Sequence, residues 1–222
     1  MSTAMRKALI NLSATVLVAL TISSTMVKAQ DITLPAPAKS GGKPLMDALN
    51  ERQSSRSFSD KDLSLQQLSD LLWAAWGINR PADKKRTAPS SSNRQEMDVY
   101  VALKSGLFLY DAEANILKQI HNRDIRALTG SQDFVGTAPV NLVYVDDLAK
   151  RGLKEGQQVT DTDLLSSWAN TGFMAQNVYL SCASEGLVCV IRAMIPRDKL
   201  APEMGLKPLQ AIILAQTVGF PQ

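Results

Sequence analysis

The segment from residue 50 to residue 60, NERQSSRSFSD, places Arg52, Ser54 and Arg56 at alternate positions. Side chains of an extended chain point alternately to two sides, so these three would project in the same direction. Two guanidinium groups with a hydroxyl between them form a donor cluster that suits a phosphate. A helix would keep the arginines together but would turn Ser54 away from them. A solvated, serine-rich surface is the alternative interpretation.

A second polar segment, residues 87–95 (TAPSSSNRQ), precedes an expected strand. Its hydroxyl and amide groups can form hydrogen bonds with a planar ligand, and its proline restricts the turn. An ordinary polar loop is the alternative interpretation. The two segments together indicate a site for a ligand with many hydrogen-bonding groups.

Several other chemistries have little support in the sequence. His121 is the only histidine, which argues against a histidine-based catalytic triad and a multi-histidine metal site. The chain has neither the G-x-G-x-x-G fingerprint nor a P-loop. Cys182 and Cys189 could pair in an oxidising compartment or remain as two buried thiols. No side chain is identified as catalytic.

The hydrophobic pattern changes its period along the chain, which predicts both helices and strands. Ser64 and Gln67 form a capping box at the start of one expected helix, and Gly77 follows its end. Helices are expected at residues 44–52, 64–76, 122–128 and 163–185. Strands are expected at residues 99–104, 107–110, 116–120, 138–145, 187–193 and 209–218. Because helices and strands do not alternate regularly, the pattern favours the α+β class over a doubly wound sheet.

Residues 1–29 have the pattern of a secretory signal. Arg6 and Lys7 precede an apolar run, and residues 27–29 (VKA) form a small-x-small cleavage pattern. A retained membrane anchor is the alternative, although the run contains Ser and Thr and falls short of the roughly 20 residues that span a bilayer. Cleavage would give an exported protein, located in the periplasm.

The rest of the chain is expected to form a linker or surface arm at residues 30–43 and one domain at residues 44–222. The chain has 222 residues, of which 45% are hydrophobic. Three of its 24 basic residues lie in the signal segment, which leaves 21 basic against 21 acidic residues. This balance argues against nucleic acid or an anionic membrane as a partner, so an anion would be bound by a local cluster.

The two polar segments together resemble those of the nitroreductase family of flavin enzymes. In that family, an R-x-S-x-[RK] segment after the first helix binds the phosphate and ribityl chain of flavin mononucleotide (FMN). A P-S-S-x-N-x-Q loop contributes to the same site from the partner subunit. The resemblance assigns cofactor-binding roles to two sets of residues, Arg52, Gln53, Ser54 and Arg56 in the first segment and Pro89, Ser90, Ser91, Asn93 and Gln95 in the second.

Further similarity extends from about residue 45 to residue 221. The stretch CASEGLVCVIRAM resembles the family's helix, glycine and strand beside the isoalloxazine, which implies that the backbone of Arg192 and Ala193 lies near N5. Gln132 and Gln176 are further matches. The acidic and glycine residues common beside the isoalloxazine are absent, and TVGFPQ stands where many members have a basic tail that reaches the phosphate. The phosphate would therefore depend more on the two arginines.

The resemblance implies an α+β sandwich, with a mainly antiparallel sheet flanked by helices, and a homodimer with FMN at its interface. It implies an oxidoreductase that acts on a small molecule, and it is strongest with the exported and SagB-type dehydrogenase-like branch. An exported protein that binds flavin or another small molecule without turnover is the alternative. Because export separates the protein from the soluble nicotinamide pool, the expected electron donor is the organic substrate or a membrane-linked carrier.

Overall fold

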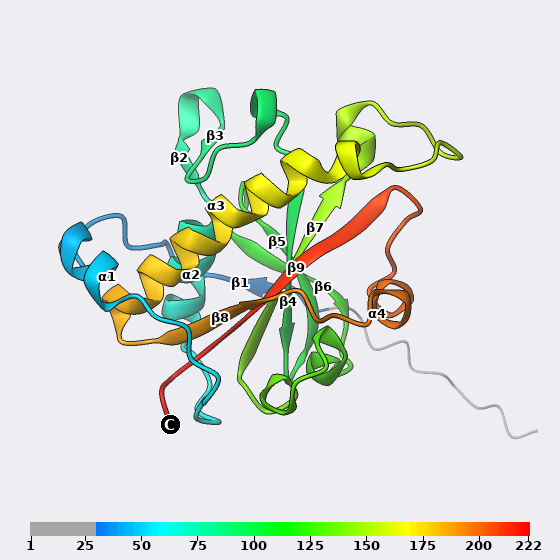
Figure 1. The fold of residues 1–222 in the computed structure, drawn as a ribbon. Coiled ribbons are helices and arrows are strands. Elements are labelled where there is room, and N and C mark those ends of the chain that lie inside the picture. Colours follow the sequence, from blue (N-terminus) through cyan, green and yellow to red (C-terminus); the bar gives the residue numbers. More distant parts are fainter. Residues whose placement is uncertain (1–29) are drawn as a thin grey trace, which may run out of the picture.

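The computed structural model describes residues 30–222, and a seven-stranded antiparallel sheet forms the centre of the fold (Figure 1). The strand order is β1-β6-β5-β4-β7-β9-β8. The strands are β1 (Ile32–Thr33), β4 (Met97–Leu103), β5 (Gly106–Asp111), β6 (Ile116–His121), β7 (Val140–Asp147), β8 (Val188–Arg192) and β9 (Gln210–Gly219). A separate two-stranded hairpin contains β2 (Ile78–Arg80) and β3 (Lys85–Arg86).

Helices cover both faces of the sheet, which confirms the expected α+β class. The helices are α1 (Leu45–Glu51), α2 (Leu65–Trp76), α3 (Asp161–Glu185) and α4 (Arg197–Glu203). Residues 30–222 also contain five 3-10 helices: η1 (Pro81–Asp83), η2 (Ser91–Asn93), η3 (Arg126–Thr129), η4 (Asp133–Val135) and η5 (Leu148–Arg151). In Figure 1 the long helix α3 (yellow) crosses the sheet diagonally, and α4 lies beside β9.

The two faces of the sheet belong to two hydrophobic clusters, as the period of a strand requires. Along β7, Leu142 and Tyr144 pack in the cluster that contains the buried residues of α2 and α3. Val143 and Val145 point the other way and pack in the cluster that contains Leu200 of α4. The strands β7 and β4 therefore have burial on both faces and form the centre of the molecule.

Local capping sets the ends of the main helices. Ser64 accepts a hydrogen bond from the backbone N–H of Gln67, and the reciprocal bond is present, so the predicted capping box at α2 is confirmed. A second capping box, between Thr160 and Asp163, starts α3 at Asp161 and so lengthens the helix expected at residues 163–185. Gly186 ends α3 with a φ of 70°, a left-handed conformation that glycine adopts without strain.

Three parts of the chain differ from the expectation. Within residues 30–43, expected to form a linker or surface arm, Ile32–Thr33 pair with β6 and Leu34 is buried, so the folded structure begins before residue 44. The helix expected at residues 122–128 is wrong. The carboxylate of Asp124 accepts a hydrogen bond from the backbone N–H of Arg126, and only the short 3-10 helix η3 forms in this stretch. The β2–β3 hairpin lies between the expected helix at residues 64–76 and the strand expected at residues 99–104, where no strand is expected.

The predicted signal segment, residues 1–29, lies outside the described residues. Between residues 30 and 222, no helix is both long and apolar enough to cross a membrane. No group of three or more His, Cys, Asp or Glu side chains in that part of the chain is placed to bind a metal ion.

Candidate cofactor site

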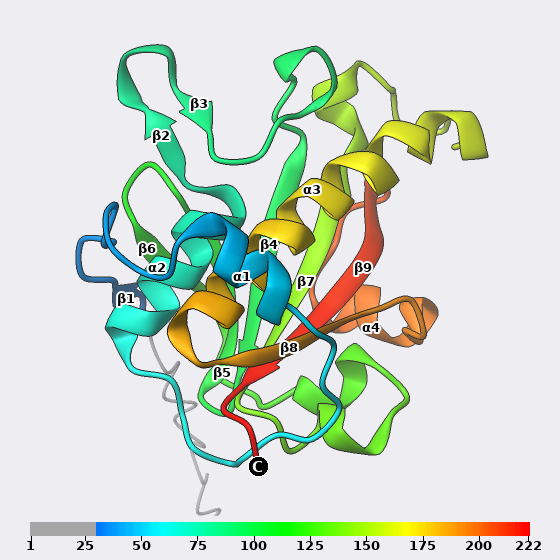
Figure 2. The ribbon, with the colours of Figure 1, turned by 60° about the vertical axis from the view of Figure 1, so that its left-hand side comes forward.

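The segment that follows α1 extends the sheet beyond its last strand. Ser54 forms a parallel bridge with Cys189 of β8, and the backbone N–H of Ser55 donates to the carbonyl of Cys189 at 3.1 Å. Residues 52–57, here called the arginine segment, are therefore extended where they meet β8, at Ser54 and Ser55, and Figure 2 shows the chain (cyan) passing β8 after it leaves α1. The edge of β8 holds the segment in place through its backbone.

The side chains of Arg52 and Ser54 point to the same side of this segment, where both contact Tyr179 of α3. The guanidinium carbon of Arg52 lies 5.3 Å from the centroid of the Tyr179 ring, and Ser54 Oγ lies 2.8 Å from the phenol oxygen. Arg56 is exposed. Within residues 30–222, neither arginine forms an ion pair with an acidic side chain. Both guanidiniums are therefore available to an anion.

Gln53 and Tyr179 lie beside a cavity of about 250 Å³ between this segment, α3 and β8. Both cysteines line the same cavity as buried free thiols, which agrees with the alternative that they do not pair. Burial raises the pKa of the Cys182 thiol well above its ordinary value, and the neighbouring Cys189 adds to the effect. The Cys182 thiol is therefore neutral at neutral pH.

The loop before β7 meets the far end of the arginine segment and the residues after β8. The rings of Phe58 and Phe134 pack with their centroids 5.4 Å apart, and the backbone N–H of Ser131 donates to the carbonyl of Met194 at 3.3 Å. The side-chain carbonyl oxygen of Gln132 is buried and has no donor among the described residues. An unpaired buried oxygen is costly, so this oxygen is a candidate for contact with a ligand.

Arg192 and Ala193, the two positions assigned beside the isoalloxazine, present different groups. The Arg192 side chain turns into the core, where it donates to Thr217 Oγ1, to the carbonyl of Thr129 and to Asn141 Oδ1 at 2.8 to 3.0 Å. Burial lowers the pKa of Arg192 to about 10. Only the backbone at this position can reach a ligand, whereas Ala193 is exposed.

The second polar segment is held together by its own side chains. Ser90 Oγ accepts from the backbone N–H of Gln95, and Gln95 Oε1 accepts from Arg86 Nε at 2.8 Å. Arg86 also stacks on Trp76 and donates to its carbonyl. Positive φ angles, near 52°, occur at three non-glycine residues of the segment, Ser92, Asn93 and Gln95. Such backbone strain persists only where side-chain contacts enforce it.

The structure does not bring the two polar segments together within one chain. Through β8 and β9, the strand register places Ser54 level with Val140, the first residue of β7. Residues 89–95 instead lead into Met97, which pairs with Asp146 near the other end of β7. About 20 Å of strand separates these two ends. Figures 1 and 2 both show β2 and β3 at the top of the molecule and the arginine segment (cyan) toward the bottom.

Gln176 lies on the exposed side of α3. The same side carries Leu165, Trp168 and Phe173, whose exposed fractions are 70%, 44% and 48%. Leu45 and Met46 of α1 add apolar surface with exposed fractions of 63% and 72%. Apolar side chains of this size and exposure form a candidate contact surface.

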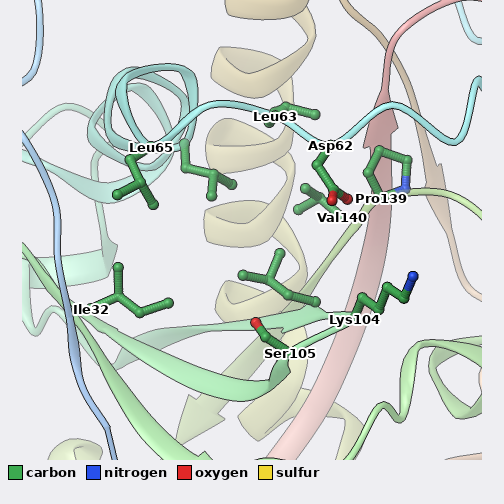
Figure 3. Close-up of a pocket in the computed structure, with 10 residues that line it drawn as sticks. Ile32, Asp62, Leu63, Leu65, Lys104, Ser105, Pro139 and Val140 are labelled. Carbon is green, nitrogen blue, oxygen red and sulfur yellow. The ribbon is translucent and has the colours of Figure 1, made fainter.

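A further cavity, of about 340 Å³, lies between Leu65 of α2, the turn after β4 and Ile32 of β1. Figure 3 shows apolar side chains from these elements around the space, with Asp62 and Lys104 at one side. None of the residues assigned to cofactor binding lines it. It is therefore a separate feature from the candidate cofactor site.

Sequence reasoning missed Tyr179, Phe58 and Phe134. Tyr179 contacts both Arg52 and Ser54, but in the sequence it is one aromatic residue within a mainly apolar helix. Phe58 follows the arginine segment at the next alternate position, which is the one local signal that could have linked it to the site. The structure alone shows that these three side chains join segments far apart in the sequence.

Comparison with known proteins agrees with this architecture. The model of the Nitroreductase family matches residues 49–220. A crystal structure of a nitroreductase from Ralstonia eutropha JMP134 is 43% identical, with a TM-score of 0.79, over 86% of this chain and 90% of that one. A nitroreductase of Methanocaldococcus jannaschii is 28% identical over 155 residues, 64% of this chain and 75% of the relative. A Desulfovibrio desulfuricans nitroreductase in complex with FMN is 20% identical, with a TM-score of 0.57, over 82% of this chain and 88% of that one.

Proposed function

Because the chain belongs to the nitroreductase family, we propose that it is an FMN-dependent oxidoreductase, alternately reduced and reoxidised on a small organic substrate. The observation that carries the proposal is the extended segment beside β8, where Arg52 and Ser54 face the same side. Neither Arg52 nor Arg56 has an acidic partner within residues 30–222. Forked donors without a counter-charge suit a terminal phosphate.

FMN, when bound, supplies the hydride and electron transfer, and the protein binds and orients it. Arg52, Ser54 and Arg56 would hold the phosphate. The unpaired oxygen of Gln132 can accept a hydrogen bond from a ring N–H group of the flavin. The exposed backbone at Ala193 lies in the segment that follows β8 and would face the ring. No acidic or basic side chain of this site is positioned to act as a proton donor, so we assign none.

We propose that the enzyme is a homodimer with shared sites. Residues 89–95 are too far along the sheet to reach the arginine segment of their own chain, and their rigid conformation suits contact with a second copy. The exposed apolar side chains of α1 and α3 supply the surface for that contact. In such a dimer, Ser91 and Asn93 of one subunit would meet the flavin held by the other.

We further propose that the protein belongs to the exported, SagB-type branch of the family and works in the periplasm. The support is the signal-like pattern of residues 1–29. The organic substrate or a membrane-linked carrier would then reduce the flavin in place of a soluble nicotinamide. Cell fractionation tests the location. An uncleaved cytoplasmic protein, reduced rapidly by a nicotinamide donor, would contradict this part of the proposal.

A flavin-binding protein without turnover is the second candidate function, since no catalytic side chain is evident. Purified protein of either kind would be yellow. Reduction of the bound flavin followed by reoxidation over repeated cycles, at roughly 1 to 10³ s⁻¹, would identify the enzyme. A bound flavin that neither accepts nor releases electrons at useful rates would identify the binding protein.

Replacing Arg52 by alanine tests the cofactor assignment directly. A hydrogen bond to a charged group contributes about 1.5 to 3 kcal/mol, so Arg52→Ala should weaken FMN binding at least about tenfold. Titration of the apoprotein with FMN, followed by quenching of flavin fluorescence, measures the change. Arg123→Ala is the matched control, because Arg123 is exposed and pairs with Glu203 away from the site. Unchanged FMN affinity in Arg52→Ala would reject the assignment.

A further inference from the structure

Tyr179 joins three parts of the candidate site within one chain, which are α3, the arginine segment and β8. It is 8% exposed on α3. Its phenol oxygen lies 2.8 Å from Ser54 Oγ and 3.0 Å from the backbone nitrogen of Ile191 in β8. Arg52 lies over the face of its ring. If the parallel pairing between the arginine segment and β8 were longer, the backbone N–H of Ile191 would donate to a carbonyl of that segment. The phenol oxygen accepts this N–H instead.

The chemistry of these groups fixes the direction of each hydrogen bond. A backbone N–H can only donate, so the phenol oxygen accepts from Ile191. The phenol has one proton of its own, and among residues 30–222 the only acceptor within reach of it is Ser54 Oγ. If Ser54 donated instead, the proton of a nearly buried phenol would have no acceptor, which is unfavourable. Tyr179 therefore donates to Ser54.

This direction leaves the hydroxyl proton of Ser54 free. Within the described part of the chain, Ser54 Oγ has Tyr179 as its only hydrogen-bond partner, and Ser54 is exposed to solvent. The chain of bonds runs from Ile191 through Tyr179 to Ser54, and each bond polarises the next. It ends in an O–H donor on the side of the segment where Arg52 lies. An ionised phosphate, whose oxygens only accept, matches such an end.

We propose that Tyr179 is a positioning residue that turns the Ser54 hydroxyl into a donor for the flavin phosphate. This inference rests on the proposed function, because it requires FMN at the arginine segment. It adds a reason for selecting the phosphorylated cofactor over riboflavin, which lacks the phosphate. The phenol acts through Ser54, and the ring separately supports the guanidinium of Arg52 by a cation–π contact.

The variant Tyr179→Phe separates these two roles, because it keeps the ring and removes the hydroxyl. It should weaken FMN binding about tenfold and leave riboflavin binding unchanged. The matched control is Tyr144→Phe, which removes another buried phenol, bonded to Gln216, from the same hydrophobic cluster. This control should leave the affinities for both flavins unchanged. Fluorescence titrations of each apoprotein with FMN and with riboflavin supply the comparison, and circular dichroism confirms the fold.

A second variant, Ser54→Ala, keeps the test decisive if Tyr179→Phe does not fold. Ser54 is exposed. Removing its hydroxyl should reduce the preference for FMN over riboflavin about tenfold, as in Tyr179→Phe. Where both variants fold, the double variant should be no weaker than the worse single variant, because both changes remove one shared donor.

Three results would overturn the inference while leaving the proposed function intact. They are unchanged FMN affinity in Tyr179→Phe, equal weakening of FMN and riboflavin in that variant, and an undiminished preference for FMN in Ser54→Ala. Wild-type protein that binds no FMN would instead reject the proposed function. The two failures are therefore distinguishable in the same set of titrations.

Discussion

Burial decides the chemistry of the two cysteines. Cys182 on α3 and Cys189 on β8 are both 1% exposed, and both are free thiols. Cys189 Sγ lies 3.4 Å from the amide nitrogen of Gln216, which marks it as a packed core group. Because burial raises the pKa of the Cys182 thiol, the nucleophilic thiolate is not populated at neutral pH. Both residues are therefore structural.

We expect the double change of Cys182 and Cys189 to serine to leave redox turnover intact. Flavin carries two electrons by itself, so no thiol is needed in the cycle. Each of the two buried hydroxyls should lower the free energy of unfolding by about 1 to 3 kcal/mol. Anaerobic reduction and reoxidation, followed by flavin absorbance, measure turnover. Lost turnover in a variant that still folds and retains flavin would show that a thiol takes part.

Arg192 shows how far residue types alone predict a role. The sequence assigns only its backbone a place beside the expected flavin and does not show where the guanidinium lies. In the structure its side chain fills a buried pocket beside Gly130, where a Cβ atom would come within 1.9 Å of Arg192 Nη1. The small residue at 130 and the arginine at 192 are 62 positions apart in numbering, so no local pattern connects them. Only the packed structure shows which way this side chain turns.

At the scale of elements, the regular helices and strands were predictable and the irregular segments were not. The apolar runs of β4 and β7 and the capping box of α2 are local, so they appear in the sequence. By contrast, β1 depends on its pairing with β6, more than 80 residues away in the chain as the pair Ile32 and Leu117 shows. The η3 turn depends on the side chain of Asp124 and the buried guanidinium of Arg126. Such contacts depend on tertiary structure.

The helix α3 contributes to three functions of the fold at once. One side packs in the core with residues such as Met174 and Val178. Tyr179 supports the arginine segment, and the exposed side carries the apolar residues proposed to contact a second subunit. Near its start, Ser167 donates to Asp146 of β7, and Asn170 donates to Glu96 at 2.8 Å. These bonds fasten the helix to the strand end that follows the second polar segment.

The buried carboxyl of Asp146 predicts a specific pH dependence of stability. Burial raises the pKa of Asp146, nearby Glu96 adds to the rise, and bonds from Ser167 and Arg151 oppose it. The folded state therefore keeps this proton to a higher pH than the unfolded state, whose value is about 3.9. Stability contributed by Asp146 is full below that pH and is lost as the pH rises through the raised pKa.

The variant Asp146→Asn removes this titration and keeps an acceptor for Ser167. We expect it to gain stability relative to the wild type as the pH rises from about 4. Urea unfolding at a series of pH values measures the difference. Asp111→Asn is the opposite control, because a bond from Lys118 lowers the pKa of Asp111. The wild type gains stability from Asp111 as the pH rises through the acid range, so this control should lose stability relative to the wild type as the pH rises there. A pH-independent difference for Asp146→Asn would contradict the prediction.

At the scale of the whole molecule, the sheet keeps the two halves of the proposed site apart. The arginine segment lies at one end of β7, and residues 89–95 lead to the other end. In the proposed dimer, each subunit would therefore contribute two half-sites. A two-fold dimer that buries Trp168, Phe173 and the exposed residues of α1 would bring each half-site against its complement in the partner.

This arrangement predicts that two inactive variants restore activity when they are mixed. Arg52→Ala should disable the phosphate half-site, and Asn93→Gly should disable the other half-site. Asn93 has a φ of 53°, which glycine tolerates, so this change removes the side chain without straining the backbone. Each homodimer would then have two damaged sites. A mixed dimer would have one site with both changes and one site with neither.

Random reassociation of the two variants should therefore give roughly a quarter of all sites in intact form. The measurement is FMN bound per subunit, and turnover, after the two purified apoproteins are partly unfolded, mixed and refolded together. Each variant refolded alone supplies the baseline, and light scattering confirms that dimers have formed. Recovery above both baselines would demonstrate that one site takes residues from two chains. If the dimers mix and nothing is recovered, both halves of each site belong to the same chain and the shared-site dimer is wrong.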